Sequence, residues 1–274
     1  MLFLKSVKKI PLSARIGLVI ILLNIIAALL APFVAPYGET DVVGDTWLSC
    51  SSSHLLGTDQ LGRDMLTRLL YGARNTISIA LIITLFSFTI GITGGLFAAT
   101  VGDQVDQLLS RIVDIIMAFP SLILALIVLS LVGTSIPVLI VVIAILHSTR
   151  VYRLSRALGM DIEVMDYVEA AKLRGEGLWW IMRHEILPNA LPPLVAEFGL
   201  RFCYVFLLMA ALSFLGLGIQ PPTADWGGMV RENAGAISFG ILTPLWPAGA
   251  ISLLTIGVNL VVDWFLRITS ELRG

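Results

Sequence analysis

Long apolar runs, separated by short polar connections, constrain this chain more than any other feature. A helix needs about 20 mostly apolar residues to cross a bilayer. The sequence contains six candidate runs, at residues 16–34, 76–99, 112–132, 136–147, 191–215 and 245–268. Of the 274 residues 57% are hydrophobic and only 14% are charged, against about 25% charged in soluble proteins. We therefore predict an all-α integral membrane protein with six transmembrane helices.

Some of these runs have irregular features. The fourth run is short, but no residue breaks its helix before Gly159, so we expect the helix to continue beyond residue 147. Pro120 lies within the third run and should kink it, because proline removes a backbone hydrogen bond. Gly91 and Gly95, four residues apart in the second run, predict a close contact between helices.

The distribution of Lys and Arg predicts the orientation. With six spans and cytoplasmic termini, thirteen of these residues lie inside, four lie outside, and Arg201 lies within a span. The inner set is Lys5, Lys8, Lys9, Arg15, Arg111, Arg150, Arg153, Arg156, Lys172, Arg174, Arg183, Arg267 and Arg273, and the outer set is Arg63, Arg68, Arg74 and Arg231. This excess obeys the positive-inside rule. The first run is longer than the roughly 7–15 residues of a signal-peptide core, so we expect an uncleaved anchor.

This topology predicts three parts. Residues 1–75 comprise a cytoplasmic tail, the first span and an external segment. Residues 76–268 form the main transmembrane domain, with a large cytoplasmic loop at 149–190, and residues 269–274 form a second cytoplasmic tail. A further external stretch, 216–244, precedes the last span.

The loop at 149–190 contains a compact charged segment. Asp166 stands three residues before Glu169, a spacing that predicts a capping box at the start of a helix. Ala170 and Ala171 should share one face of that helix with Tyr167. Because alanine side chains are small, we expect this face to let another protein pack closely against it.

Glycine and proline should divide the rest of this loop. Gly175 and Gly177 are expected to end the first helix, because glycine readily adopts the left-handed conformation found there. A second helix is expected over 178–186, with Pro188 blocking its extension. The simpler interpretation is a loop anchored at the membrane surface by its tryptophans, which leaves the alanine and glycine spacing unexplained.

The sequence "EAAKLRG", followed by "ILP", resembles the EAA motif of membrane subunits in bacterial binding-protein-dependent ABC importers. The matching residues are Glu169, Ala170, Ala171, Gly175, Leu187 and Pro188. The resemblance implies that this segment, with Asp166 at its start, is a coupling helix that docks onto an ATP-hydrolysing subunit. Glu185 departs from the motif, where the family has isoleucine.

Two further segments narrow the resemblance. "HLLGTDQLGRDMLTRLLYGAR" (54–74) and "ALSFLGLGIQPPTADWGGM" (211–229) resemble C-type permeases of dipeptide, oligopeptide and nickel importers. This implies a type I ABC importer (MetI-like) transmembrane domain in a bacterial inner membrane. It also implies a second, homologous permease as partner, two ATP-binding subunits that hold ATP and Mg²⁺, and an extracytoplasmic solute-binding protein.

The residues themselves point to a non-catalytic subunit without its own cofactor. The chain contains no GxxxxGK[ST] phosphate loop and no GxSxG nucleophile motif. His54, His147 and His184 are scattered singly, without metal-ligand spacing, and Cys50 and Cys203 form no CxxC pair. No basic patch with interleaved aromatic residues predicts nucleic acid as a partner.

Glu197 and Arg201 are ionisable residues within the fifth run. They lie four residues apart and so share one helical face. Charges within a membrane usually face a cavity or a partner. Two interpretations stay open: the pair lines the translocation pathway, or it lies at the interface with the second permease.

One other class of protein stays open as an alternative. A self-contained secondary transporter or channel would need its own coupling-ion sites and often an internal repeat, and we find no convincing repeat. The cargo also stays open among peptides, nickel chelates, glutathione and opines.

Overall fold

The computed structural model describes residues 11–271, with side chains described as far as residue 268. Lys5, Lys8, Lys9 and Arg273, which entered the charge count above, lie outside these residues, as do parts of both predicted tails. The elements are α2 (Leu12–Val34), α3 (Met65–Val101), α4 (Asp103–Met117), α5 (Ser121–Val132), α6 (Ile136–Glu163), α7 (Asp166–Leu173), α8 (Leu178–Ile181), the π-helical turn η2 (Met182–Ile186), α9 (Leu187–Phe214), α10 (Trp226–Asn233), the 3₁₀ turn η3 (Ala234–Phe239) and α11 (Leu245–Glu271).

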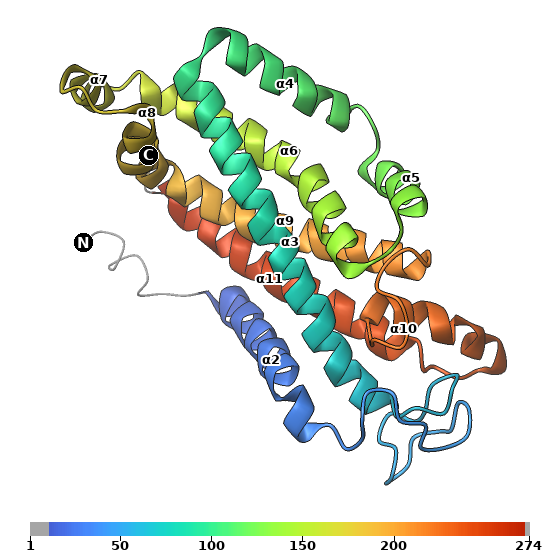
Figure 1. Cartoon of the computed structure of the whole chain (residues 1–274). Helices are drawn as coiled ribbons and strands as arrows, with labels where there is room; N and C mark the ends of the chain where they lie inside the picture. Colours follow the sequence, from blue (N-terminus) through green and yellow to red (C-terminus); the bar gives the residue numbers. More distant parts are fainter. Residues whose placement is uncertain (1–10, 272–274) are drawn as a thin grey trace.

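The architecture is a bundle of long helices with polar segments gathered at its two ends (Figure 1). We call the end that carries α7, α8 and η2 the loop end. We call residues 35–64 and 215–244, at the opposite end, the rim. Within the described residues five helices are long and apolar enough to cross a membrane, and α4 with α5 supplies a sixth crossing if the bent pair is counted as one. The prediction of an all-helical membrane protein is confirmed.

The third span differs from its expected form. Instead of one kinked helix over 112–132, α4 and α5 are separate helices bent by 87° at the break between them. Pro120 immediately precedes α5, and its ring cannot continue the hydrogen-bond ladder from α4. Proline therefore ends one helix and begins another here.

The second and fourth spans, α3 and α6, form the most extensive helix–helix contact in the bundle. Both are longer than expected, because Asp64 caps α3 well before residue 76 and α6 continues past Gly159 to Glu163. A Cβ atom built on Gly91 would lie 2.5 Å from the Val151 Cβ, and one on Gly95 would lie 2.6 Å from the Tyr152 carbonyl oxygen. The predicted close helix contact is thus confirmed, with α6 as the neighbour of α3.

The fifth span also begins earlier than predicted. The helical run continues from Leu178 to Phe214, so the expected stop at Pro188 is wrong. The π-helical turn η2 precedes Pro188, and the Leu187 amide donates to the Met182 carbonyl, five residues back. Near the first turn of a helix a missing proline N–H costs little, so the chain passes from the loop into α9 without a break.

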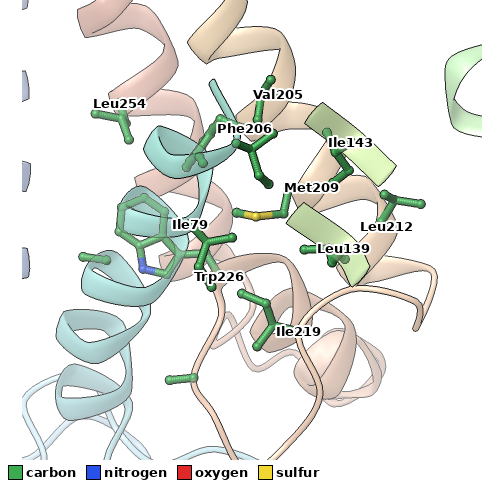
Figure 2. Packing of buried hydrophobic residues seen from close by; sticks show 14 of the residues in the cluster. Ile79, Leu139, Ile143, Val205, Phe206, Met209, Leu212, Ile219, Trp226 and Leu254 are labelled. Carbon is green, nitrogen blue, oxygen red and sulfur yellow. The ribbon is translucent and has the colours of Figure 1, made fainter. Parts of the chain in front are cut away.

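The main apolar core lies where α3, α6, α9, α10 and α11 meet. Figure 2 shows the Trp226 and Phe206 rings together with Met209 and Leu139 in this cluster. The Phe206 and Trp226 rings meet edge to face, with their centroids 6.1 Å apart. Because Trp226 belongs to the rim, this packing fixes the rim to the membrane helices.

Candidate functional site

The charged loop is a folded structure packed onto the ends of three long helices. Val168 and Ala171 of α7 are fully buried. They belong to an apolar cluster whose members come from α3, α6, α7, α8, η2 and α9, namely Leu96, Ile162, Val168, Ala171, Ile181, Met182, Ile186, Ala190 and Leu194. A force applied to α7 would therefore reach the transmembrane helices through direct side-chain contact.

Two expectations about α7 are wrong in detail. Met165 occupies the N-cap position and no side chain caps the helix, so Asp166 and Glu169 form no capping box. Both carboxylates instead lie in the first turn, where they stabilise the helix dipole. Ala171 points into the apolar cluster, while Ala170 is exposed, so the two alanines do not share one outer surface.

The glycine turn after α7 has the predicted form. Gly175 has a φ of +84°, a conformation that costs residues with a Cβ about 1–2 kcal/mol. The Gly175 amide donates to the Lys172 carbonyl and the Glu176 amide to the Ala171 carbonyl, at 2.9 and 3.2 Å. Gly177 has an extended conformation and precedes α8. The prediction that Gly177 helps to end α7 is therefore wrong.

The outer surface of the loop combines apolar and acidic groups. Met165, Tyr167 and Leu173 are exposed large hydrophobic residues, and the side chain of Leu173 is 84% exposed. Glu169 and Ala170 lie exposed beside them. We call these five residues the outer face of α7. This face thus presents three large apolar side chains and one carboxylate that the rest of the described chain does not cover.

Leu187 and Pro188 lie at the junction between η2 and α9. Leu187 packs against the apolar cluster that also contains Ala171, so both halves of the motif meet in one core. Glu185, the residue that departs from the family motif, lies 3.7 Å from the Arg174 guanidinium. This ion pair links the end of α7 to η2.

Glu197 and Arg201 form the pair that their spacing predicted. Arg201 Nε donates to Glu197 Oε1 at 2.9 Å, and a second guanidinium nitrogen contacts the same oxygen. The guanidinium also lies 5.2 Å from the centre of the Tyr204 ring. Since Glu197 lies ten residues after Leu187, the pair is about 15 Å further along the helix than the loop motif.

The rim contains a network of buried charges that sequence analysis missed. Asp59 Oδ2 lies 2.6 Å from Arg63 Nε and 3.3 Å from Arg68 Nε. Glu232 Oε2 lies 2.9 Å from Arg63 and 3.2 Å from Arg68. The first three residues belong to one of the external sequence motifs, and Glu232 follows the other. The only signal in the sequence is the presence of acids and bases in both external segments.

Further hydrogen bonds join the two halves of the rim and attach both halves to α3. Glu39 Oε1 accepts hydrogen bonds from Asn75 at 3.1 Å and from the Ala224 amide at 2.6 Å. Asp225 accepts from the Thr76 hydroxyl at 3.1 Å and from the Gly228 amide at 2.8 Å. Burial raises the pKa of the Asp225 carboxyl, although these hydrogen bonds act in the opposite direction. The rim is therefore built as one folded unit.

A family model matches much of this sequence. Residues 91–271 match the model described as "Binding-protein-dependent transport system inner membrane component". This region begins in α3 and includes the loop and all of the later helices.

Individual relatives cover nearly the whole chain. The dipeptide transport system permease protein DppC of Alkalihalophilus pseudofirmus is 36% identical over 94% of this chain and 85% of its own length. The di/tripeptide permease protein DppC of Pseudomonas aeruginosa is 37% identical over 90% of this chain and 84% of its own. The glutathione permease protein GsiD of Pectobacterium atrosepticum is 33% identical over 89% and 81%.

A solved structure supports the fold. A chain of the MetNI methionine ABC transporter, in an inward-facing conformation, aligns with a TM-score of 0.59. The alignment covers 74% of this chain and 97% of that chain, at 21% sequence identity. The predicted MetI-like transmembrane domain is confirmed.

Proposed function

Because this chain belongs to the family of binding-protein-dependent transport system inner membrane components, and is a permease subunit of an ABC importer, we propose that it forms part of the pathway for peptides or a chemically related solute. The relatives named above as dipeptide, di/tripeptide and glutathione permeases support this substrate class. All of these solutes carry peptide-like amides and free carboxylates.

The proposed assembly contains this chain, a second homologous permease, two ATP-binding subunits and an extracytoplasmic solute-binding protein. ATP and Mg²⁺ would bind to the ATPase subunits. The loop end would face the cytoplasm and the rim the opposite side, in agreement with the distribution of Lys and Arg.

We assign ATPase coupling to the loop. The observation that carries this assignment is the two-sided structure of α7. Its outer face is exposed and partly apolar, while Val168 and Ala171 join the cluster that reaches α3, α6 and α9. Docking on the outer face would therefore move the transmembrane helices, provided that the docked subunit makes different contacts in its two states.

The motif residues have separate roles in this proposal. Asp166, Glu169 and Ala170 present the helix to the ATPase, and Gly175 makes the turn that follows. Ala171, Leu187 and Pro188 fix the helix to the start of α9. We place Glu197 and Arg201 beside the pathway; Arg201 is only 7% exposed, and its pairing with Glu197 avoids an unpaired ion inside the membrane.

A purification of tagged complexes tests this proposal. Wild-type chain extracted in mild detergent should carry two ATPases and the second permease, identified by mass spectrometry. Glu169→Arg should lose the ATPases but keep the second permease, because it reverses one charge on the outer face of α7. Asp161→Arg is a matched control, since Asp161 is exposed on α6 at the same end of the molecule.

The uptake of a labelled dipeptide provides the functional measurement. Membrane vesicles with the wild-type complex should accumulate it only with ATP and the binding protein. A chain that purifies alone and transports without ATP would contradict the proposal and favour the secondary transporter.

A further inference from the structure

A cavity of about 220 Å³ lies at the loop end, between α3 and the segment that joins α8 to α9. Its lining comes from both sides: Ile92, Thr93, Leu96, Trp179, Met182, Arg183 and Leu187. Leu96 and Met182 are buried members of the apolar cluster of the loop, so they form the floor of the cavity. Trp179 is 64% exposed and Thr93 is exposed as well, so the cavity opens on the outer surface of the bundle.

The position of the cavity along α3 places it near one boundary of the bilayer. No charged residue occurs between Arg74 and Asp103. The 28 residues between them make about 42 Å of helix, which exceeds the hydrocarbon core of about 30 Å. Leu96 lies seven residues before Asp103, or about 10 Å along the helix. The cavity therefore opens toward lipid close to the level at which the headgroups begin.

The surface of α3 beside the cavity suits contact with hydrocarbon. Ile90 and Phe97 are 44% and 43% exposed. The Thr89 and Thr93 hydroxyls donate to carbonyls of their own helix, those of Leu85 and Thr89, at 2.9 and 2.6 Å. Because these hydroxyl donors are already used within the helix, the surface presents their methyl groups together with the large apolar side chains.

The composition of the lining indicates an apolar occupant. A buried water molecule needs about three hydrogen-bond partners. The lining is apolar apart from the Thr93 hydroxyl, whose hydrogen is already donated, and the charged end of Arg183. An apolar space of this kind stays dry and takes an apolar guest. In a bilayer, the apolar group available at its opening is an acyl chain.

Arg183 adds a charge at the edge of the cavity. It is exposed, and it has no ion-pair or hydrogen-bond partner among residues 11–268. The acid nearest to it in sequence, Glu185, pairs with Arg174 instead. A long basic side chain can lay its aliphatic stem on an apolar surface while its charged end reaches the headgroups. Trp179, four residues earlier, is of the residue type that is enriched at this level of a membrane.

We propose that this cavity binds an anionic phospholipid of the surrounding bilayer, with one acyl chain in the cavity and the headgroup phosphate on Arg183. The inference goes beyond the proposed function and rests on it only for the leaflet, which is the inner one if the loop end faces the cytoplasm. A helix of the second permease would also fill an apolar space. It would have to bring an acidic side chain into a membrane span, where such residues are disfavoured, whereas the leaflet already holds anionic headgroups at this level.

Photocrosslinking of a lipid tests the site. The purified transporter would be placed in nanodiscs of phosphatidylglycerol and phosphatidylethanolamine, with a trace of phosphatidylglycerol that carries a diazirine on one acyl chain. Mass spectrometry should locate the adducts on peptides that contain residues 92–96 or 179–187. Arg183→Gln should reduce their yield several-fold, the effect of one basic residue beside anionic lipid. Unlabelled phosphatidylglycerol should compete several-fold better than phosphatidylethanolamine.

Matched variants separate the cavity from the general surface. Thr93→Phe should also reduce the yield several-fold, because its ring would occupy the space of the acyl chain. Thr89→Phe changes an exposed residue one helical turn away that does not line the cavity, and it should leave the yield within twofold of the wild type. Arg111→Gln removes the same charge as Arg183→Gln from an exposed position on α4 outside the cavity, and it should have as little effect as Thr89→Phe.

Several results would overturn the proposal. They are adducts spread evenly along α3, equal competition by the two lipids, an unchanged yield in Arg183→Gln, or an equal loss in Arg111→Gln. A benzophenone attached to Thr93→Cys, in a Cys50→Ser background that lacks the exposed native thiol, identifies what covers the cavity. It should crosslink to phospholipid, and a crosslink to the second permease or to an ATPase would overturn the proposal. Neither measurement requires ATP or transport, so a failure of the proposed function would leave this result readable.

Discussion

The adjacent residues Ala170 and Ala171 have opposite environments. Substitutions at the two positions can therefore distinguish an effect on the folding of the loop from an effect on the binding of the ATPase. Ala171 is fully buried beside Val168, whereas Ala170 is exposed. Ala171→Arg should unfold the loop, because burying an unpaired cation costs several kcal/mol. Ala170→Arg should leave the chain monodisperse by size-exclusion chromatography but prevent the ATPases from co-purifying. An Ala170→Arg chain that still binds the ATPases would contradict the assignment of the outer face.

Asp225 should give the rim a dependence on pH. Its raised pKa means that the folded state binds this proton more tightly than the unfolded state. Its contribution to stability is therefore greatest below the ordinary Asp pKa and decreases as the pH rises through the raised value. Asp225→Asn should flatten this part of the pH profile in thermal unfolding of the detergent-solubilised chain.

The matched variant at this position is Asp225→Ala. It leaves the Gly228 amide and the Thr76 hydroxyl without their acceptor and should cost about 1–3 kcal/mol more than Asp225→Asn. Equal stability of the two variants would show that the carboxyl charge, rather than its hydrogen bonds, governs this site.

At the scale of elements, the α3–α6 contact depends on the missing side chains of two glycines. Gly95→Ala would place a Cβ 2.6 Å from a backbone oxygen of α6, whereas Gly94→Ala would meet only the Tyr152 ring at 3.4 Å. We expect Gly95→Ala to lower stability by about 1–3 kcal/mol. Gly94→Ala should change it by less than about 0.5 kcal/mol. Thermal unfolding midpoints of the two variants, measured side by side, check this expectation.

Several helices and turns followed from a local rule in the sequence, although the capping box predicted at Asp166 did not. The apolar runs, the Gly175 turn and the Glu197–Arg201 pair are local features, and the structure contains all of them. Pro188 and Pro120 show where local rules reach their limit. The same residue type lies inside a continuous helix at one position and at a break of 87° at the other, because the neighbouring turns, rather than proline alone, decide whether the lost hydrogen bond is replaced.

The burial of Ala171 and the rim network could not be predicted for a different reason. Both depend on contacts between residues far apart in the chain, such as Arg63 with Glu232. No period or spacing within either segment contains that information. The sequence motifs identified the segments correctly, but the structure was needed to show that their charges bind one another.

At the scale of the whole molecule, Cys50 is a natural reporter of orientation. It is exposed in the rim, whereas Cys203 is buried. In intact spheroplasts a membrane-impermeant maleimide should label the wild-type chain and leave Cys50→Ser unlabelled. Labelling that appears only in inside-out vesicles would reverse the orientation inferred from the charge distribution.

The ion pairs of the rim also bear on the order in which its two segments can fold during synthesis. Glu232 is synthesised 169 residues after Arg63, whose guanidinium it contacts at 2.9 Å. When residues 35–68 first emerge from the membrane, Asp59 is the only acidic member of the finished network that has been made, so it is the only one that Arg63 and Arg68 can pair with. Buried charges need their partners, so we expect the charge network of this first external segment to be completed only after residues 215–244 have been translated and have crossed to the same side. The part of the rim that is exported first is thus completed late. A chain whose synthesis stops before residue 232 contains Arg63 and Arg68 but lacks Glu232, the second carboxylate that both of them contact.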